Sequence, residues 1–204
     1  MASEDLPANG HGGPADPKPA LRRTLRVARG TYVAGLTDGG RGALETALAA
    51  TLAAHLPPGV VAGYHAIGSE IGLQRFGRAT LFPRVVDLAP LVFHTGPASA
   101  GRTVARLETL AEPQSEAPQG TPDLVLLPLL AADRRGTRLG QGGGYYDRTL
   151  AALRAAGRVF AVGVAWDMQL VDRLPADPWD APLDALATPS QWLTFPATPP
   201  MSRR

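Results

Sequence analysis

The chain contains no cysteine among its 204 residues. This absence excludes disulfide bonds, thiolate metal sites and thiol nucleophiles, so any catalysis must use other side chains. An excess of charge is also missing, because 20 lysine and arginine residues are balanced by 18 aspartate and glutamate residues, for a formal net charge of +2. So small an excess gives no reason by itself to expect a nucleic-acid partner.

Long apolar runs are also absent, because no stretch approaches the roughly 18 consecutive apolar residues that a membrane-spanning helix requires. The first residues, MASEDLPANGHGGPADPKPA, lack the basic-then-apolar order of a signal peptide. We therefore expect a soluble cytoplasmic protein that has no membrane partner. Proline, glycine and polar residues predict disordered tails over 1–16 and 193–204, which leaves one folded domain over 17–192.

The remaining pattern alternates short apolar runs with helical segments. Apolar spacing predicts helices over 18–36, 42–55 and 145–156. Six runs are too short for helices and are apolar on both faces, as strands buried in a parallel sheet are; they span 60–66, 79–83, 90–94, 123–128, 158–166 and 183–188. The sequence thus predicts an α/β fold with a layered, mostly parallel sheet and helices on both faces, a Rossmann-like three-layer arrangement. Residues 96–121 are expected to form a long loop, functional or lid-like, with a short helical turn near 102–110.

One stretch, RLGQGGGYYDRTL over 138–150, stands between a predicted strand and a predicted helix. Glycines there let backbone N–H groups converge on an anion, and the helix N-terminus adds partial positive charge. A phosphate site and a simple tight turn both explain the pattern, which matches neither common phosphate motif. Asp147 follows the glycines in the first helical turn, where it is either a partner of the helix dipole or a magnesium ligand beside phosphates.

A row of cations lies on one face of the first predicted helix. Lys18, Arg22, Arg26 and Arg29 recur at i, i+4, i+8 and i+11, which places them along one side. A solvated basic face is the simpler interpretation of this row.

Several segments together resemble the 5-formyltetrahydrofolate cyclo-ligase family. The most specific is RLGQGGGYYDRTL preceded by LVLLPLLAADRRGT, and the others are KPALR, GSEI, TLFPR, LAEP and QLVDRLPADPWDAPLDALAT. They occur in the family's order over residues 18–190. The resemblance implies that 5-formyltetrahydrofolate and ATP are converted to 5,10-methenyltetrahydrofolate, ADP and phosphate through a phosphorylated formyl (iminophosphate) intermediate, with Mg²⁺ as cofactor and ATP as co-substrate.

The resemblance also assigns roles to individual positions. Lys18 and Arg22 match the family's N-terminal pair that reaches the ATP phosphates, and with Arg138 they are the expected catalytic cations. The segment that would wrap the triphosphate comprises Arg138, Leu139, Gly140, Gln141, Gly142, Gly143, Gly144, Tyr145 and Tyr146. Asp147 and Asp180 match magnesium ligands, although a helix-end charge and a turn aspartate are the plainer alternatives. Arg26 and Arg29 stay with the solvated interpretation.

The folate side rests on fewer residues. By the resemblance, Glu70 matches the family's pterin-binding residue; a carboxylate can accept two hydrogen bonds from a 2-amino-pyrimidinone edge. An ordinary loop charge is the alternative. Gln141 to Tyr145 would also face the folate. His65 either lines this pocket or packs at a strand end.

The chain departs from the family pattern after Glu70, where a helix is cut by roughly two turns, and Trp179 and Pro189 stand where histidine and glutamate are usual. Trp179 is interpreted as packing, with an apolar cover of the nucleotide as the alternative. A relative that binds folate or nucleotide but has lost turnover is the second functional hypothesis. A nucleic-acid-binding protein is the weakest, because aromatic residues do not alternate with the basic ones. A monomer or weak homodimer acting on small-molecule substrates is expected.

Overall fold

The computed structural model describes residues 16–96, 99–102, 110–157 and 159–196. The predicted N-terminal tail lies outside the described residues except for Asp16. The predicted C-terminal tail begins too early, because Leu193 and Thr194 belong to a strand and Phe195 packs against a core cluster. Three α-helices span Lys18–Ala34 (α1), Asp38–His55 (α2) and Tyr145–Ala156 (α3), and a short 3₁₀ helix spans Asp167–Gln169 (η1). The helix α2 begins four residues before the predicted start because the Thr37 side chain accepts a hydrogen bond from the Gly40 N–H and caps it.

The six predicted strands are all present in one seven-stranded sheet in the order β12-β11-β9-β6-β1-β2-β3. The inner pairs are parallel, whereas β3 and β12 run antiparallel at the two edges. The strands of this sheet are β1 (Val61–Ala62), β2 (Ala79–Arg84), β3 (Val92–Thr95), β6 (Leu124–Pro128), β9 (Phe160–Val164), β11 (Ala185–Ala187) and β12 (Trp192–Thr194). The predicted mostly parallel α/β fold is confirmed.

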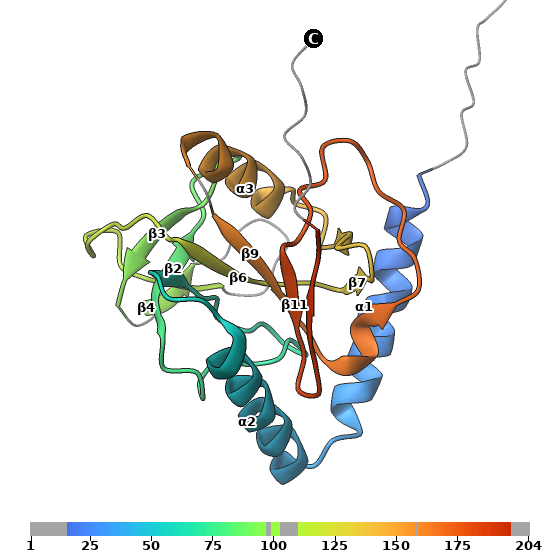
Figure 1. Cartoon of the computed structure of the whole chain (residues 1–204). Coiled ribbons are helices and arrows are strands. Elements are labelled where there is room, and N and C mark those ends of the chain that lie inside the picture. The colour runs from blue at the N-terminus through green and yellow to red at the C-terminus, as the bar shows by residue number, and fades with distance from the viewer. Residues whose placement is uncertain (1–15, 97–98, 103–109, 158, 197–204) are drawn as a thin grey trace, which may run out of the picture.

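Alternate residues of the central strand β6 enter two different cores. Leu124 and Leu126 pack with Leu48 and Leu52 of α2, whereas Val125 and Leu127 pack with Leu150 of α3. Accordingly, α2 and α3 lie on opposite sides of the sheet (Figure 1). Burial on both faces is what the apolar runs without strict alternation indicated.

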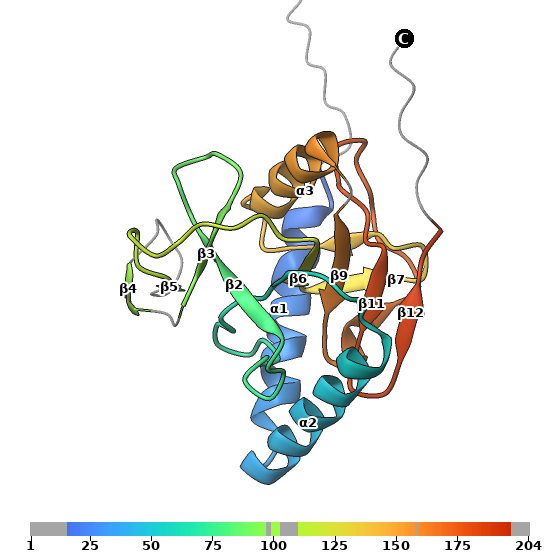
Figure 2. The same ribbon diagram turned by 60° about the vertical axis from the view of Figure 1, so that its left-hand side comes forward.

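A second, smaller sheet supports the first helix. It has the order β10-β7-β8 and consists of β7 (Ala131–Asp133), β8 (Arg138–Leu139) and β10 (Leu170–Val171). Leu21 and Leu25 of α1 pack on Ala131, Leu139 and Leu174. The helix therefore crosses next to the segments that follow β6 and β9, as the rotated view shows (Figure 2).

The structure corrects three local expectations. The polar turn predicted between β6 and the glycines is the β7–β8 hairpin, closed by the buried Asp133, which accepts hydrogen bonds from the N–H groups of Arg135 and Thr137. The predicted loop over 96–121 contains the antiparallel pair β4 (Ser99–Arg102) and β5 (Leu110–Glu112). The helical turn expected near 102–110 falls mainly on residues 103–109, which lie outside the described residues, and both of its ends belong to strands.

The segment after Glu70 contains no helix, in agreement with the predicted shortening. Residues 71–78 form turns and irregular structure before β2 begins. Ile71, Leu73 and Phe76 are buried and pack in the same core as Leu48 and Leu52 of α2. The apolar side chains of this short crossover therefore close one side of the sheet that a helix would otherwise cover.

Candidate active site

A cavity of about 1390 Å³ lies at the carboxyl ends of β1 and β6. This is where ligands bind in open α/β sheets, and it exceeds the roughly 300–1,000 Å³ of a typical single-ligand pocket. Every site residue predicted from the sequence lines it: Lys18, Arg22, His65, Glu70, Arg138, Leu139, Gly140, Gln141, Gly142, Gly143, Gly144, Tyr145, Tyr146, Asp147 and Asp180. The fold therefore gathers into one cavity residues separated by up to 162 positions in the chain.

The glycine segment connects β8 to α3 along the cavity wall. Gly142 has φ +105° and Gly144 has φ +66°, both in the left-handed region that residues with a Cβ seldom adopt. Gly144 is also the N-cap residue of α3 and provides no capping side chain. The first backbone N–H groups of α3 therefore have no capping side chain at the helix end that borders the cavity. Uncapped N–H groups at a helix N-terminus bind anions.

The cations of α1 contact successive parts of this site. The Lys18 ammonium meets Asp177 and Asp180, and Arg22 Nε donates to Gly140 O over 3.1 Å. One turn further on, Arg26 Nη2 donates to Gln141 Oε1 over 2.8 Å. The row predicted at i, i+4 and i+8 therefore faces the site. Arg26 remains exposed as expected, but it holds the side chain of Gln141.

Arg29 contradicts the solvated interpretation, because it is only 3% exposed. Its Nη1 lies 3.7 Å from Glu70 Oε1 and donates to Leu129 O over 3.1 Å. Periodicity placed Arg29 on the same face as Lys18 but could not reveal that the loop carrying Glu70 covers that end of the helix.

Lys18 is held by two carboxylates at once. Its Nζ lies 2.5 Å from Asp177 Oδ2 and 2.5 Å from Asp180 Oδ2. Desolvation by burial lowers the pKa of Lys18, but the hydrogen bonds and charges of the two aspartates outweigh it, so that the pKa is raised above its ordinary value. Lys18 is therefore a firmly protonated cation. Asp177 was not singled out from the sequence, and only its spacing of three residues before Asp180 could have signalled it.

A second ion pair joins the other predicted carboxylate to the buried Arg138. Arg138 Nη2 donates to Asp147 Oδ1 over 2.6 Å, and the same oxygen accepts a hydrogen bond from Ala181 N–H over 3.1 Å. Because Ala181 follows Asp180 directly, this bond brings the Asp147 and Asp180 segments together. Three carboxylates and two cations are thus paired with one another at this end of the cavity.

Several buried side-chain nitrogens of the cavity wall have no hydrogen-bond partner within the described part of the chain. They are His65 Nε2, Arg138 Nε and Arg148 Nε. Leaving such a group unsatisfied costs about 1–3 kcal/mol, so each calls for an explanation. All three residues line the same cavity, and a bound polar ligand would satisfy them.

His65 and Glu70, which follow β1 in the chain, form another side of the cavity. The His65 ring stacks on Phe82 at 4.5 Å between centroids, and burial lowers its pKa, so it is neutral at pH 7. Glu70 is 4% exposed and its Oε2 accepts a hydrogen bond from Ile67 N–H over 3.1 Å. Burial raises the pKa of Glu70, while the Ile67 N–H, Arg29 and Gln141 oppose the increase. His65 therefore both packs and lines the cavity.

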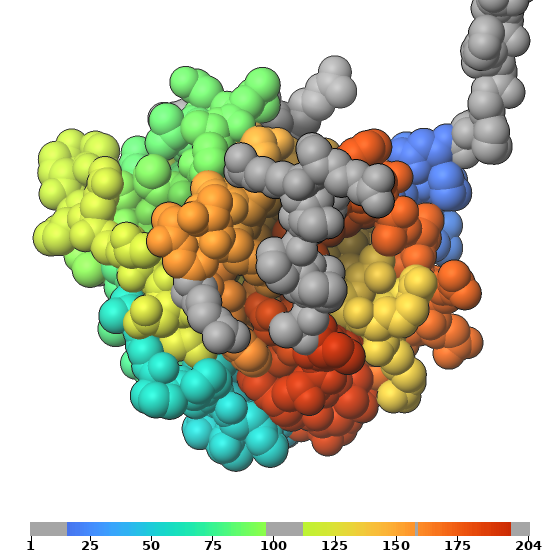
Figure 3. All heavy atoms as spheres, turned by 45° about the horizontal axis from the view of Figure 1, so that its top comes forward, coloured from blue at the N-terminus to red at the C-terminus, as the bar shows by residue number. Residues whose placement is uncertain are grey.

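The mouth of the cavity carries two exposed apolar side chains, Leu88 at 76% and Trp179 at 73% exposure. The interpretation of Trp179 as packing is wrong. Its neighbours in sequence are prolines and aspartates, which do not indicate on which side the ring lies. On the other rim, the β2–β3 segment lies beside α3 (Figure 3), where Leu91 N–H donates to Thr149 Oγ1 over 2.8 Å.

Comparison with known proteins gives consistent results. Residues 77–189 match the model of the 5-formyltetrahydrofolate cyclo-ligase family. The 5-formyltetrahydrofolate cyclo-ligase of Mycolicibacterium smegmatis is 36% identical over 145 residues, covering 64% of this chain and 74% of that protein. The Escherichia coli K12 enzyme is 49% identical over 69 residues, a segment that spans 34% of this chain and 37% of the enzyme.

Solved structures extend the likeness to nearly the whole fold. The NMR structure of Aquifex aeolicus 5,10-methenyltetrahydrofolate synthetase superimposes with a TM-score of 0.70 and 27% identity, covering 93% of this chain and 98% of that one. The Mycoplasma pneumoniae 5,10-methenyltetrahydrofolate synthetase, at 24% identity and a TM-score of 0.62, shares the fold. No helix in the described residues is long and apolar enough to cross a membrane. The family match over more than half of the chain, and the relative covered over 74% of its length, show that this chain belongs to the 5-formyltetrahydrofolate cyclo-ligase family.

Proposed function

We propose that this chain catalyses the ATP-dependent ring closure of 5-formyltetrahydrofolate to 5,10-methenyltetrahydrofolate, with release of ADP and phosphate. One observation carries the proposal: a single cavity, large enough for two ligands, is lined both by cations and carboxylates suited to MgATP and by Glu70, a carboxylate suited to the pterin ring. Family membership supports the same activity.

The chemistry explains why ATP is needed. The formyl oxygen attacks the γ-phosphorus of ATP, and the bond from that phosphorus to the β-phosphate oxygen breaks, releasing ADP. N10 of the folate then attacks the formyl carbon. Loss of the N10 proton and cleavage of the carbon–oxygen bond expel phosphate and leave the methenyl bridge between N5 and N10. Such a phosphoryl transfer depends mainly on positioning and charge neutralisation.

In this proposal, Lys18, Arg22 and Arg138 neutralise the phosphates. Lys18 is protonated and held by two carboxylates, and the buried Nε of Arg138 has no hydrogen-bond partner within the described residues. Gly140 to Gly144 bring their backbone close to the phosphates, and the α3 N-terminus adds partial positive charge. Leu139, Tyr145 and Tyr146 complete the wall of this side. Trp179, which is exposed and lines the cavity, would cover the nucleotide.

Asp147 and Asp180 are the proposed holders of Mg²⁺. The residues fit this ion, because Mg²⁺ takes one or two carboxylates and completes its shell with substrate phosphates and water. The described residues contain no cluster of three metal-type ligands, in keeping with a site that needs the phosphates. When bound, the ion would neutralise charge on the nucleotide. With Asp180 and Asp147 holding the ion, Lys18, which is also paired with Asp177, and Arg138 would face the phosphates.

The folate is proposed to occupy the side of Glu70 and His65. Glu70 would accept hydrogen bonds from the 2-amino-pyrimidinone edge of the pterin, and His65 offers its unpartnered Nε2. Gln141 to Tyr145 lie between the two sides of the cavity and would contact both ligands. The formyl group would then meet the γ-phosphate at the glycine segment.

The decisive experiment incubates the purified protein with 5-formyltetrahydrofolate and MgATP and follows the near-ultraviolet absorbance of the methenyl product. We expect an increase that requires both substrates. Binding of 5-formyltetrahydrofolate and MgATP without any increase would instead establish a binding protein that has lost turnover. That outcome would be attributed to the folate side, where residues 71–78 lack a helix.

We further propose that the protein acts in the cytoplasm as a monomer or weak homodimer. The absence of cysteine is compatible with a reducing compartment. Sedimentation at micromolar concentration tests the oligomeric state, and fractionation of cells that express the chain tests the compartment.

A further inference from the structure

The buried pair Arg29 and Glu70 contains a contact that the proposed chemistry does not use. Both side chains are nearly inaccessible, at 3% and 4% exposure. Burying two charges is costly unless each is compensated. Their closest atoms, Arg29 Nη1 and Glu70 Oε1, are 3.7 Å apart, which is beyond ordinary hydrogen-bond length. Arg29 therefore acts on Glu70 chiefly through its charge.

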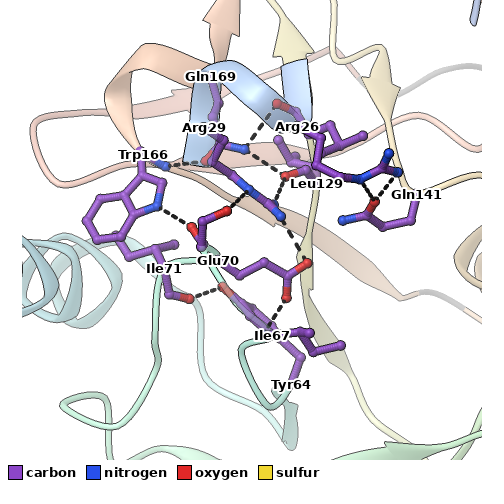
Figure 4. A network of polar contacts seen from close by, with 12 residues as sticks. Arg26, Arg29, Tyr64, Ile67, Glu70, Ile71, Leu129, Gln141, Trp166 and Gln169 are labelled. Atoms are coloured by element: carbon purple, nitrogen blue, oxygen red, sulfur yellow. Dashed lines mark hydrogen bonds and ion pairs between the residues drawn. The ribbon is translucent and has the colours of Figure 1, made fainter. Parts of the chain in front are cut away.

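Arg29 itself is fixed from several directions (Figure 4). Its Nε donates to Ser69 Oγ over 3.0 Å, and its Nη1 donates to Leu129 O over 3.1 Å. The guanidinium thus connects α1 to the Glu70 loop and to the end of β6.

Trp166 and Gln169 complete this network. Trp166 Nε1 donates to Ser69 O over 3.0 Å, and Gln169 Nε2 donates to Leu129 O over 2.7 Å. Gln169 Oε1 accepts the Trp166 N–H, which joins these two residues at the end of β9. Ser69 and Leu129, the two residues that accept hydrogen bonds from Arg29, are therefore held in turn by Trp166 and Gln169. The position of the Arg29 guanidinium is fixed as a result.

We infer that Arg29 is a positioning residue, which keeps Glu70 ionised and oriented so that this carboxylate accepts two hydrogen bonds from the folate. The inference rests on the proposed function. It also explains how the Glu70 loop keeps its geometry without the helix that usually follows: polar contacts from α1 and β9 replace helical packing. Arg29 does not contact the ATP side, where Lys18 and Arg22 lie.

The ionisation of Glu70 depends on the groups that face it. These are Arg29 from α1, Tyr64 after β1, Tyr146 from α3 and Gln141 from the glycine segment. Burial raises the pKa of both tyrosines above the usual value, so they stay neutral over the working pH range. Arg29 is thus the cation among these four groups that opposes protonation of Glu70.

The test compares Arg29→Met, Arg29→Lys and the control Arg23→Met, an exposed arginine on the same helix that does not line the cavity. Calorimetry measures the binding of 5-formyltetrahydrofolate alone and of MgATP alone. We expect Arg29→Met to weaken folate binding about tenfold or more, because an opposite charge at this distance shifts a carboxyl pKa by roughly 1–3 units. MgATP binding should stay within about twofold, Arg29→Lys should restore part of the folate affinity, and Arg23→Met should behave as the unsubstituted chain.

Two further measurements separate positioning from a general loss of structure. In a Glu70→Gln background, Arg29→Met should cause no additional loss of folate affinity. The acid limb of kcat/KM for 5-formyltetrahydrofolate should move to higher pH by about one unit or more in Arg29→Met. Equal losses for both ligands, or a full additional loss in the Glu70→Gln background, would overturn the inference.

The binding measurements need no turnover. If the Arg29→Met variant binds 5-formyltetrahydrofolate normally, only the role of Arg29 is overturned. A chain that, without substitution, neither binds nor converts 5-formyltetrahydrofolate overturns the proposed function.

Discussion

Gly142 offers the sharpest test of the glycine segment. Its φ of +105° lies where an alanine would be strained, and a Cβ built there would lie 3.4 Å from both Cζ and Nε of Arg22. Strained backbone of this kind costs about 1–3 kcal/mol. If the segment must hold this conformation to bind phosphate, Gly142→Ala should weaken MgATP binding by about 5- to 150-fold, since 1.4 kcal/mol corresponds to a factor of ten.

Gly39, an exposed residue in the first turn of α2 that does not line the cavity, provides a control. It does not have a positive φ, and a Cβ there would meet no atom within 4 Å. Gly39→Ala should therefore leave MgATP affinity nearly unchanged, and thermal stability unchanged or slightly higher, because alanine restricts the unfolded chain at a compatible site. Calorimetric titration with MgATP, with a melting curve for each variant, measures both effects. If the two variants bind MgATP equally well, the left-handed conformation of Gly142 is not what binds the nucleotide.

Three other substitutions probe the metal, the nucleotide cover and the hairpin. Asp147→Asn keeps the acceptor for Ala181 N–H but loses the charge, so turnover should fall by about a hundredfold while 5-formyltetrahydrofolate still binds; normal turnover would remove Asp147 from the metal site. MgATP should change tryptophan fluorescence through the exposed Trp179, and Trp179→Phe should abolish that change because Trp166 is fully buried and Trp192 stacks on His55 outside the cavity lining; a persisting signal would place the nucleotide elsewhere. Burial raises the pKa of Asp133, but hydrogen bonds from Arg135 and from backbone N–H groups outweigh it and hold the pKa below its ordinary value. A lowered carboxyl pKa stabilises the fold above about pH 4 and this contribution is lost as pH falls. Asp133→Asn should therefore reduce the free energy of unfolding by about 1–3 kcal/mol at pH 7, and by much less near pH 3 in chemical denaturation.

Local pattern was sufficient for the elements that pack by regular periodicity. Helix α3 occupies residues 145–156, as predicted, because its apolar spacing follows directly on a run of glycines. The six apolar runs became strands of one sheet because each is short, mostly apolar and bounded by turn residues. The strands that were missed are short, such as β7 with three residues and β8 with two. They exist because Asp133 closes their turn and α1 packs on them, and neither contact leaves a periodic signal.

The features of the site also divide into those that the sequence predicted and those that it did not. The glycine motif and the family resemblance together selected residues that all line the cavity. Spacing also placed Lys18, Arg22, Arg26 and Arg29 on one helical face. Only the tertiary structure decided that Arg29 is buried against Glu70, that Asp177 shares Lys18 with Asp180, and that Trp179 is exposed. The physical reason is that a helical repeat sets the direction of a side chain, whereas burial and ion pairing depend on which distant segment covers it.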